Sequence, residues 1–387
     1  METDKQASYE SPDETPDTAA ETVEAESSMP PPPVEPVARE ASWMDTPWVS
    51  TAVRVVFGLI VLVVTWCFYV SRMPDTFDVN ERAMQRALER EHVEEGGTLL
   101  PGYTTVSTVL ELAEWLLGKP GGYLHNDRLF PNAYLIDNMP NFELGVVFEL
   151  RDTVKALREN FSRSRGQTEE LPYLIAADGN FSYDPDNWLV PSTESEYRQG
   201  IRNVNRYLQA IVDGGPGSGL FVSRQDVLER HLESRARRLG SFSVRLRRSA
   251  ADGYAFNPNL ERQNLQTEPD PLSAEYTGDL NSRITPWHRR DDEFYEVRGS
   301  VYVMYHVMLA LRTDFEDELN DKRAMGLMNR ILSELHAASQ PLVCPVVLNG
   351  REYGFFHNHS LTAAAHIAKA HVAVNDLRIL LRGGSDG

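Results

Sequence analysis

Cysteine is almost absent from this sequence. Only Cys67 and Cys344 occur among its 387 residues, the first inside a long apolar stretch and the second far away in a more polar part. We therefore expect no intramolecular disulfide, and composition excludes a disulfide-stabilised scaffold. No C-x-x-C pair is present, which argues against a thiol redox site or a structural zinc site of that kind.

Positive charge is also scarce. The chain has 38 Lys and Arg against 57 Asp and Glu, a formal net charge of −19. Residues 1–47 alone carry 12 acidic side chains against only Lys5 and Arg39. A negative surface repels phosphate groups, so we expect no nucleic-acid partner.

The familiar catalytic and cofactor-binding motifs are missing as well. The glycine-rich segment Gly214–Gly219 lacks the lysine and the following hydroxyl residue of a phosphate-binding loop, and Ser218 has no G-x-S-x-G context. No H-E-x-x-H sequence occurs. We expect no cofactor, and we interpret residues 214–219 as a flexible connection.

One long apolar run is present, at residues 49–70, and its core Val55–Val70 has no charged side chain. At about 1.5 Å per residue its 22 residues reach roughly 33 Å, enough to cross a hydrocarbon layer of about 30 Å. No small-residue cleavage site follows Val70, so we expect a retained transmembrane anchor rather than a cleaved signal peptide. Aromatic residues typical of membrane interfaces cluster near the two ends: Trp43, Trp48, Trp66 and Tyr69.

The segments outside this run predict two tails and leave the orientation open. Residues 1–48 are acidic and proline-rich, so we expect a disordered tail there and another at 383–387. Near the span, two arginines precede its apolar core and four follow it. That count would place the large domain in the cytoplasm, but the rule is weak for long domains.

Helical periodicity dominates the rest of the chain. Asp78 is a predicted N-cap of a helix to about His92, and Thr193 with Glu196 resembles a capping box for a helix to about Val212. Strand-like runs such as Val343–Leu348 are few and short. We predict a mainly α fold, a transmembrane helix followed by an α-helical bundle, with two packed subdomains at 72–213 and 220–382 as an open alternative. The further predicted helices cover 105–117, 141–161, a leucine-rich seam from Leu228 to Leu246, 291–313, 323–338 and 359–382.

Several long segments are similar to a known family. They are GYTTVSTVLELAEWLLGKPGGYLHND (102–127), LIDNMPNFELGVVFELRD (135–152), NWLVPSTESEYRQGI (187–201), DDEFYEVRG (291–299) and NHSL (358–361). They resemble the bacterial domain-of-unknown-function family 2333 over nearly all of residues 72–382. The resemblance implies a single-pass inner-membrane protein with a short cytoplasmic N-terminus and a periplasmic domain. It implies no activity and no functional residues.

Glu296 and His359 are the candidate catalytic residues. Glu296 follows the acidic residues Asp291, Asp292 and Glu293, and paired carboxylates can divide acid and base roles. Acidic residues are also favoured in a first helical turn by the helix dipole, and a buried Glu296 paired with Arg298 or another arginine would be structural. Both interpretations stay open at this stage.

His357 and His359 are the candidate metal ligands, since they flank Asn358 at the start of a predicted helix. His366 and His371 follow at spacings that do not all share one helix face, so capping and packing roles are the alternative.

Two further patterns have structural alternatives. Oxygen-bearing residues alternate from Asp178 to Asp186 as in calcium loops, but the central glycine and closing glutamate are missing, so Asx turns also explain them. A basic run at 235–248 could meet anionic lipid, or could be a solvated helix face neutralised by Glu229 and Glu233.

These observations favour a membrane-anchored envelope protein that acts as a non-catalytic interaction or scaffolding module. Its expected partners are the lipid bilayer and another envelope protein. The alternative is a membrane-tethered periplasmic hydrolase that uses Glu296, or His357 and His359, or all three, and it predicts a pocket that joins these side chains.

Overall fold

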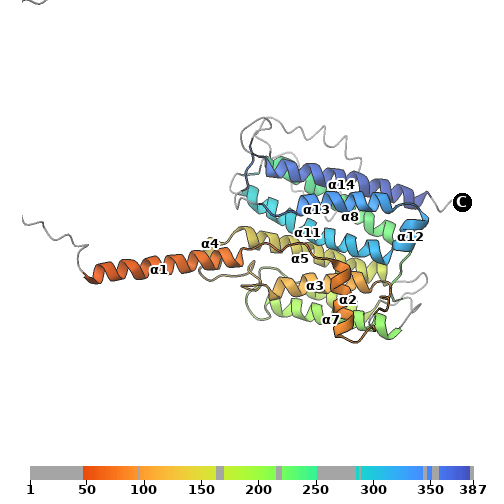
Figure 1. Ribbon diagram of the computed structural model, residues 1–387, viewed down its shortest axis with the longest axis horizontal. Helices are drawn as coiled ribbons and strands as arrows, with labels where there is room; N and C mark the ends of the chain where they lie inside the picture. Colours follow the sequence, from red (N-terminus) through yellow and green to blue (C-terminus); the bar gives the residue numbers. More distant parts are fainter. Residues whose placement is uncertain are drawn as a thin grey trace, which may run out of the picture. The chain divides into compact units, whose positions relative to one another are not determined.

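The protein is mainly α-helical. A computed structural model describes residues 47–94, 96–162, 170–214, 220–250, 285–286, 289–342, 347–350 and 357–383, and over these ranges it contains helices and no strand (Figure 1). The β pairing among the described residues is one isolated antiparallel bridge between Asn349 and Asn358. The predicted fold class is therefore confirmed.

The helices agree with most of the predicted ranges. Short elements α4, α6 and α12 were not expected, and a π-helical turn, η2, extends α5. The elements are α1 (Pro47–Val70), α2 (Val79–Glu89), α3 (Tyr103–Gly118), α4 (Asn132–Leu135), α5 (Asn138–Ala156), η2 (Leu157–Phe161), α6 (Pro172–Phe181), α7 (Thr193–Gly214), α8 (Gln225–Ala250), α11 (Arg290–Asp314), α12 (Glu316–Asp321), α13 (Met325–Ser339) and α14 (His359–Arg382).

Helix α1 carries an exposed apolar surface. Thirteen of its large hydrophobic side chains are exposed, from Trp48 to Tyr69. Among the described residues, Trp48–Val70 is the one helix long and apolar enough to cross a membrane. A core helix of a soluble protein would bury such side chains, because exposing them to water is unfavourable. The surface of α1 is therefore compatible with lipid as its surroundings.

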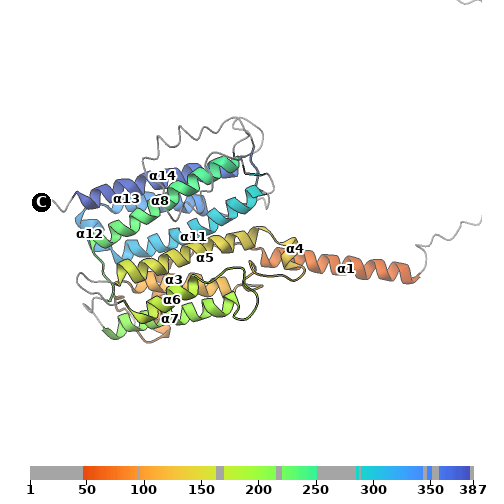
Figure 2. The ribbon, with the colours of Figure 1, turned by 180° about the vertical axis from the view of Figure 1, so that it is seen from behind.

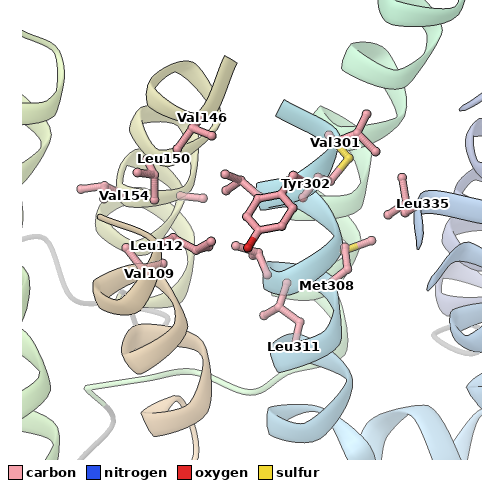
Figure 3. Packing of buried hydrophobic residues seen from close by; sticks show 14 of the residues in the cluster. Val109, Leu112, Val146, Leu150, Val154, Val301, Tyr302, Met308, Leu311 and Leu335 are labelled. Atoms are coloured by element: carbon pink, nitrogen blue, oxygen red, sulfur yellow. The ribbon is translucent and has the colours of Figure 1, made fainter. Parts of the chain in front are cut away.

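Residues 58–387 form one compact unit whose central helix is α11. It packs against α3 and α5 on one side and against α8 and α13 on the other, and α14 lies along α8 and α13 (Figures 1 and 2). Figure 3 shows side chains of α3, α5, α11 and α13 meeting in this core. They include Val109, Leu112, Val146, Leu150, Val301, Tyr302, Met308 and Leu335, all of which are buried.

The crossing of α5 and α11 is unusually close. A Cβ atom added to Gly145 would lie 1.9 Å from the carbonyl oxygen of Glu296, and one added to Gly299 would lie 2.0 Å from that of Phe142. The hydroxyl of Ser300 donates a 2.9 Å hydrogen bond to the Gly145 carbonyl across the same contact. Two glycines thus let the backbones of α5 and α11 touch at this point.

Helix starts show both local and distant capping. Asp78 accepts from the amides of Asn80 and Glu81, as predicted. The predicted capping box at Thr193 is wrong, since its hydroxyl donates to the carbonyls of Asp184 and Asn187 instead. That hydroxyl closes the preceding loop, and the side chain that accepts from the first turn of α7 is Ser192, whose Oγ accepts from the amide of Ser195 at 3.4 Å.

Helix α3 has no cap from its own segment. Gly102 precedes it with a φ of +88°, and a Cβ atom there would lie 2.2 Å from the Phe221 ring. Asp314, at the end of α11, instead accepts from the amide of Thr105 at 2.8 Å and from its hydroxyl at 2.6 Å. A carboxylate at a helix N-terminus satisfies free amides and matches the helix dipole.

Some predictions fall outside the described residues: most of the tail at 1–48, the loop at 215–219, Cys344 with most of the strand-like run Val343–Leu348, and most of the tail at 383–387. The hydrophobic core includes residues of both predicted subdomains, 72–213 and 220–382. That division stays a prediction.

Candidate functional site

Glu296, the first candidate catalytic residue, is held in a bidentate ion pair. It lies on α11, and both of its carboxylate oxygens accept from Arg245 of α8 at 2.9 Å. The side chains are only 14% and 20% exposed, for Glu296 and Arg245 respectively. A bidentate arginine–carboxylate pair is a strong, oriented contact, and this one ties α11 to α8. The contact corresponds to the structural interpretation, with Arg245 rather than Arg298 as the partner.

Arg298 has a different environment. It is buried on α11, and its Nε donates to the Ser339 carbonyl at the end of α13. The guanidinium also lies over the rings of Phe142 and Tyr295, at 5.6 and 5.9 Å from their centroids. No described carboxylate pairs with it, and burial lowers its pKa to about 10. It acts as a cationic cap on a helix C-terminus.

His359 and His357 lie at the start of α14. The Nδ1 atom of His359 accepts from the amide of Leu348, and its own amide donates to the Leu348 carbonyl. The two imidazole rings are nearly parallel, with centroids 6.4 Å apart. Burial, and then the neighbouring His357, lowers the pKa of His359. One ring nitrogen of His359 is thus used to hold the preceding segment against the helix.

The contacts of the described residues do not join these candidates. Glu296 pairs with α8, whereas His359 binds residue 348, and no hydrogen bond or ion pair among the described residues connects them. Among the described residues, no cluster of possible metal ligands includes His357 or His359. The catalytic role of Glu296 and His359 and the metal role of His357 and His359 stay predictions that these contacts do not support.

Three carboxylates form a cluster, of which only Asp291 and Asp292 stood out in the sequence analysis. Asp137 precedes α5 and lies beside Asp291 and Asp292 of α11, with ligand oxygens all within 4.8 Å of one another. Asn141 donates a 2.6 Å hydrogen bond to Asp292. Burial, together with the charges of Asp137 and Asp291, raises the pKa of Asp292 to about 6. No local pattern links residue 137 to 291, so sequence reasoning missed the third carboxylate.

Two buried acids of α5 also escaped prediction. Glu143 is fully buried, forms an ion pair with Lys119, and accepts from the amides of Leu124 and His125 at 2.8 and 2.9 Å. Burial outweighs these partners and raises its pKa to about 7. These bonds fix the turn that follows α3 against α5.

Glu149, in the C-terminal half of α5, likewise joins α5 to a neighbouring segment. It is buried and pairs with Arg235 and Arg238 of α8, and Arg238 also reaches Asp152. Arg235, Arg238 and Arg245 of the basic run thus pair with acids of neighbouring helices, whereas Arg237 is exposed. A contact of the run with anionic lipid stays a prediction. Glu229 and Glu233, expected to neutralise it, pair instead with Arg378 and Arg382 of α14.

The calcium-like residues divide among separate partners. Asp178 and Asn180 lie in α6, where Asp178 pairs with Arg158 and Asn180 donates to Glu196. Asp184 accepts from the amide of Asp186, the Asx turn that the alternative predicted. Asp178, Asn180 and Asp184 thus bond to separate partners, as the turn interpretation predicts.

Comparison with known proteins yields a family without an assigned activity. The family model described as "Uncharacterized protein conserved in bacteria (DUF2333)" matches residues 41–384. No curated protein and no solved structure matches the chain. The match covers most of the sequence, including α1 and the helical body, and confirms the resemblance found in the segments. The chain therefore belongs to this bacterial family of uncharacterised proteins.

Proposed function

We propose that this protein is a single-pass inner-membrane protein that keeps α1 as its anchor, and that its helical domain is a periplasmic, non-catalytic interaction module. The observation that carries the proposal is the apolar, exposed surface of α1. Lipid is the environment in which such a surface is stable, whereas exposing it to water is unfavourable. A helix retained in lipid anchors the rest of the chain.

The placement of the candidate side chains supports a non-catalytic role. Glu296, Glu149 and Glu143 all hold neighbouring segments together through ion pairs. His359 orders the start of α14. These contacts hold helices and loops of the domain together, as a scaffold or docking module requires.

Cysteine accessibility tests the topology. In a chain with Cys67→Ser and Cys344→Ser, Val372→Cys introduces a thiol on α14 at a position that is 53% exposed. A membrane-impermeant maleimide applied to intact spheroplasts should label it. Ser8→Cys, in the acidic tail, is the matched control and should react only after permeabilisation. The reverse pattern would place the domain in the cytoplasm and overturn the periplasmic assignment.

Crosslinking in living cells tests the interaction. The native protein, crosslinked and identified by mass spectrometry, should yield reproducible links from the helical domain to other envelope proteins. Links confined to the chain itself, under conditions that capture known neighbouring envelope proteins, would contradict the module hypothesis.

A further inference from the structure

Exposed hydrophobic side chains gather on two loops of the helical body: the first joins α3 to α5 and includes the short helix α4, and the second joins α6 to α7. Outside α1, the described residues have twelve exposed large hydrophobic side chains, and seven of them lie in these loops. We call the set the apolar rim; it consists of Leu129, Phe130, Tyr134, Leu135, Trp188, Leu189 and Val190. A surface patch of this kind in a soluble region marks a site of interaction.

The first loop of the apolar rim is bonded to the end of α1. The indole Nε1 of Trp66 donates to the Oδ1 atom of Asn132 in α4 at 3.1 Å, and Asn132 donates to Asp127. Figures 1 and 2 both show α4 beside the C-terminal end of α1. Trp66 lies four residues before Val70, about 6 Å along the helix axis. Tyr69 lies beside it, with ring centroids 6.4 Å apart.

The second loop is bonded to the first. Asn126 donates to the Asn187 carbonyl at 3.1 Å, and the His125 Nε2 atom lies 3.1 Å from the carboxylate of Asp186. The two loops therefore lie together at one end of the body, the end at which α1 finishes.

The side chain of Asn187 holds the backbone of the second loop in place. The side chain of Asn187 donates to the Tyr183 hydroxyl and accepts from the amide of Leu189. With this backbone held from inside, the three following side chains point outward: Trp188 is 56% exposed, Leu189 60% and Val190 97%. Hydrogen bonds thus fix an apolar tip that the fold itself does not cover.

We propose that the apolar rim inserts into the interfacial layer of the same bilayer that α1 spans, on the side where α1 ends; this rests on α1 being the anchor proposed above. Trp and Tyr are the residues that favour this layer, and Trp66 of the span is hydrogen-bonded to the rim. Arg72 and Arg128 are exposed next to the span and the first loop, where guanidinium groups can meet lipid phosphates. The domain would thus lie against the membrane rather than hang from a free tether.

A fluorescent reporter on the rim tests this contact in the full chain. Val190→Cys, in a background with Cys67→Ser and Cys344→Ser, is labelled with an environment-sensitive nitrobenzoxadiazole dye and reconstituted into phosphatidylethanolamine–phosphatidylglycerol vesicles. Val372→Cys is the matched control, because it also replaces an exposed valine but lies on α14. Leu129→Cys provides a second reporter on the other loop.

The proposal predicts blue-shifted emission at positions 190 and 129, with several-fold stronger quenching by doxyl-labelled lipid than at position 372. Equal quenching at all three positions would overturn it. A blue shift without lipid quenching would also overturn it, because a protein surface would then cover the rim. Flotation of the same samples keeps the two proposals apart: a chain that floats but is not quenched refutes the rim alone, whereas a chain that does not float refutes the anchor and the rim together.

Discussion

The close approach of α5 and α11 at Gly145 and Gly299 predicts that alanine destabilises the protein at Gly145, whereas alanine at Gly179, which has open space around it, stabilises the protein. In Gly145→Ala the new methyl group would lie 1.9 Å from the Glu296 carbonyl oxygen and 2.9 Å from the Ser300 amide nitrogen. Both neighbours are backbone atoms, so no side chain can rotate away. The helices α5 and α11 must move apart, and the 2.9 Å bond from Ser300 to the Gly145 carbonyl is lost or stretched.

The expected change in the free energy of unfolding is the sum of two losses and one gain. Overpacking of a core costs about 1–3 kcal/mol, and a buried hydrogen bond left unmade costs about 1–3 kcal/mol. Alanine gains about 1 kcal/mol over glycine inside a helix. The net loss in the free energy of unfolding is therefore about 1–5 kcal/mol, a decrease in Tm of roughly 1–7 °C for a domain of this size.

Thermal and urea unfolding of the detergent-solubilised chain, followed by far-UV circular dichroism, measures this loss. Gly179→Ala is the matched control, because Gly179 also lies in a helix and a Cβ atom there has no neighbour within 4 Å. That variant should be more stable than the wild type by about 0.5–1 kcal/mol. If Gly145→Ala were as stable as the wild type, the backbone contact between α5 and α11 would be refuted.

Three other substitutions test separate features. Glu149→Gln leaves the buried Arg235 guanidinium without its carboxylate and should lower the free energy of unfolding by about 3–5 kcal/mol in the same assay; a loss below about 1 kcal/mol would argue against a buried pair. Asp314→Ala removes the cap of α3, so we expect a loss of about 1–2 kcal/mol and faster hydrogen exchange at the amide of Thr105; unchanged exchange there would contradict the cap. Burial and neighbouring charges raise the pKa of Asp292 to about 6 from an ordinary value of 3.8. The folded state then binds more protons than the unfolded state between these two values, so this residue makes stability fall as the pH rises through that window. Asp292→Asn should therefore reduce the fall in the free energy of unfolding between about pH 4 and pH 7. An unchanged dependence of that free energy on pH would show that the pKa of Asp292 is not raised.

Local sequence patterns predicted the helices but not their partners. The apolar spacing at 105–117 and 141–161 gave α3 and α5, and the Asp78 cap was correct because capping involves residues two or three positions apart. The bond between Asp314 and Thr105 joins positions 209 residues apart, and no periodicity encodes it. Distance along the chain therefore limited what could be predicted.

Charged residues were the least predictable part of the candidate site. The arginines of α8 are polar by sequence, but three of them face inward, because acids of α5 and α11 compensate the cost of burial. The structural alternative for Glu296 allowed Arg298 or another arginine as the partner, and the structure pairs Glu296 with Arg245. A sequence shows which residues are charged, but the ion-pair partner of each one depends on how the helices pack.

Alkaline carbonate extraction of cell membranes, with the full-length chain followed by intact mass, tests the central claim most directly. If α1 is a retained anchor, the chain stays in the membrane pellet at its full mass, and only detergent releases it. Recovery of the intact chain in the carbonate supernatant, or of a shortened chain that has lost residues 47–70, would contradict the anchor.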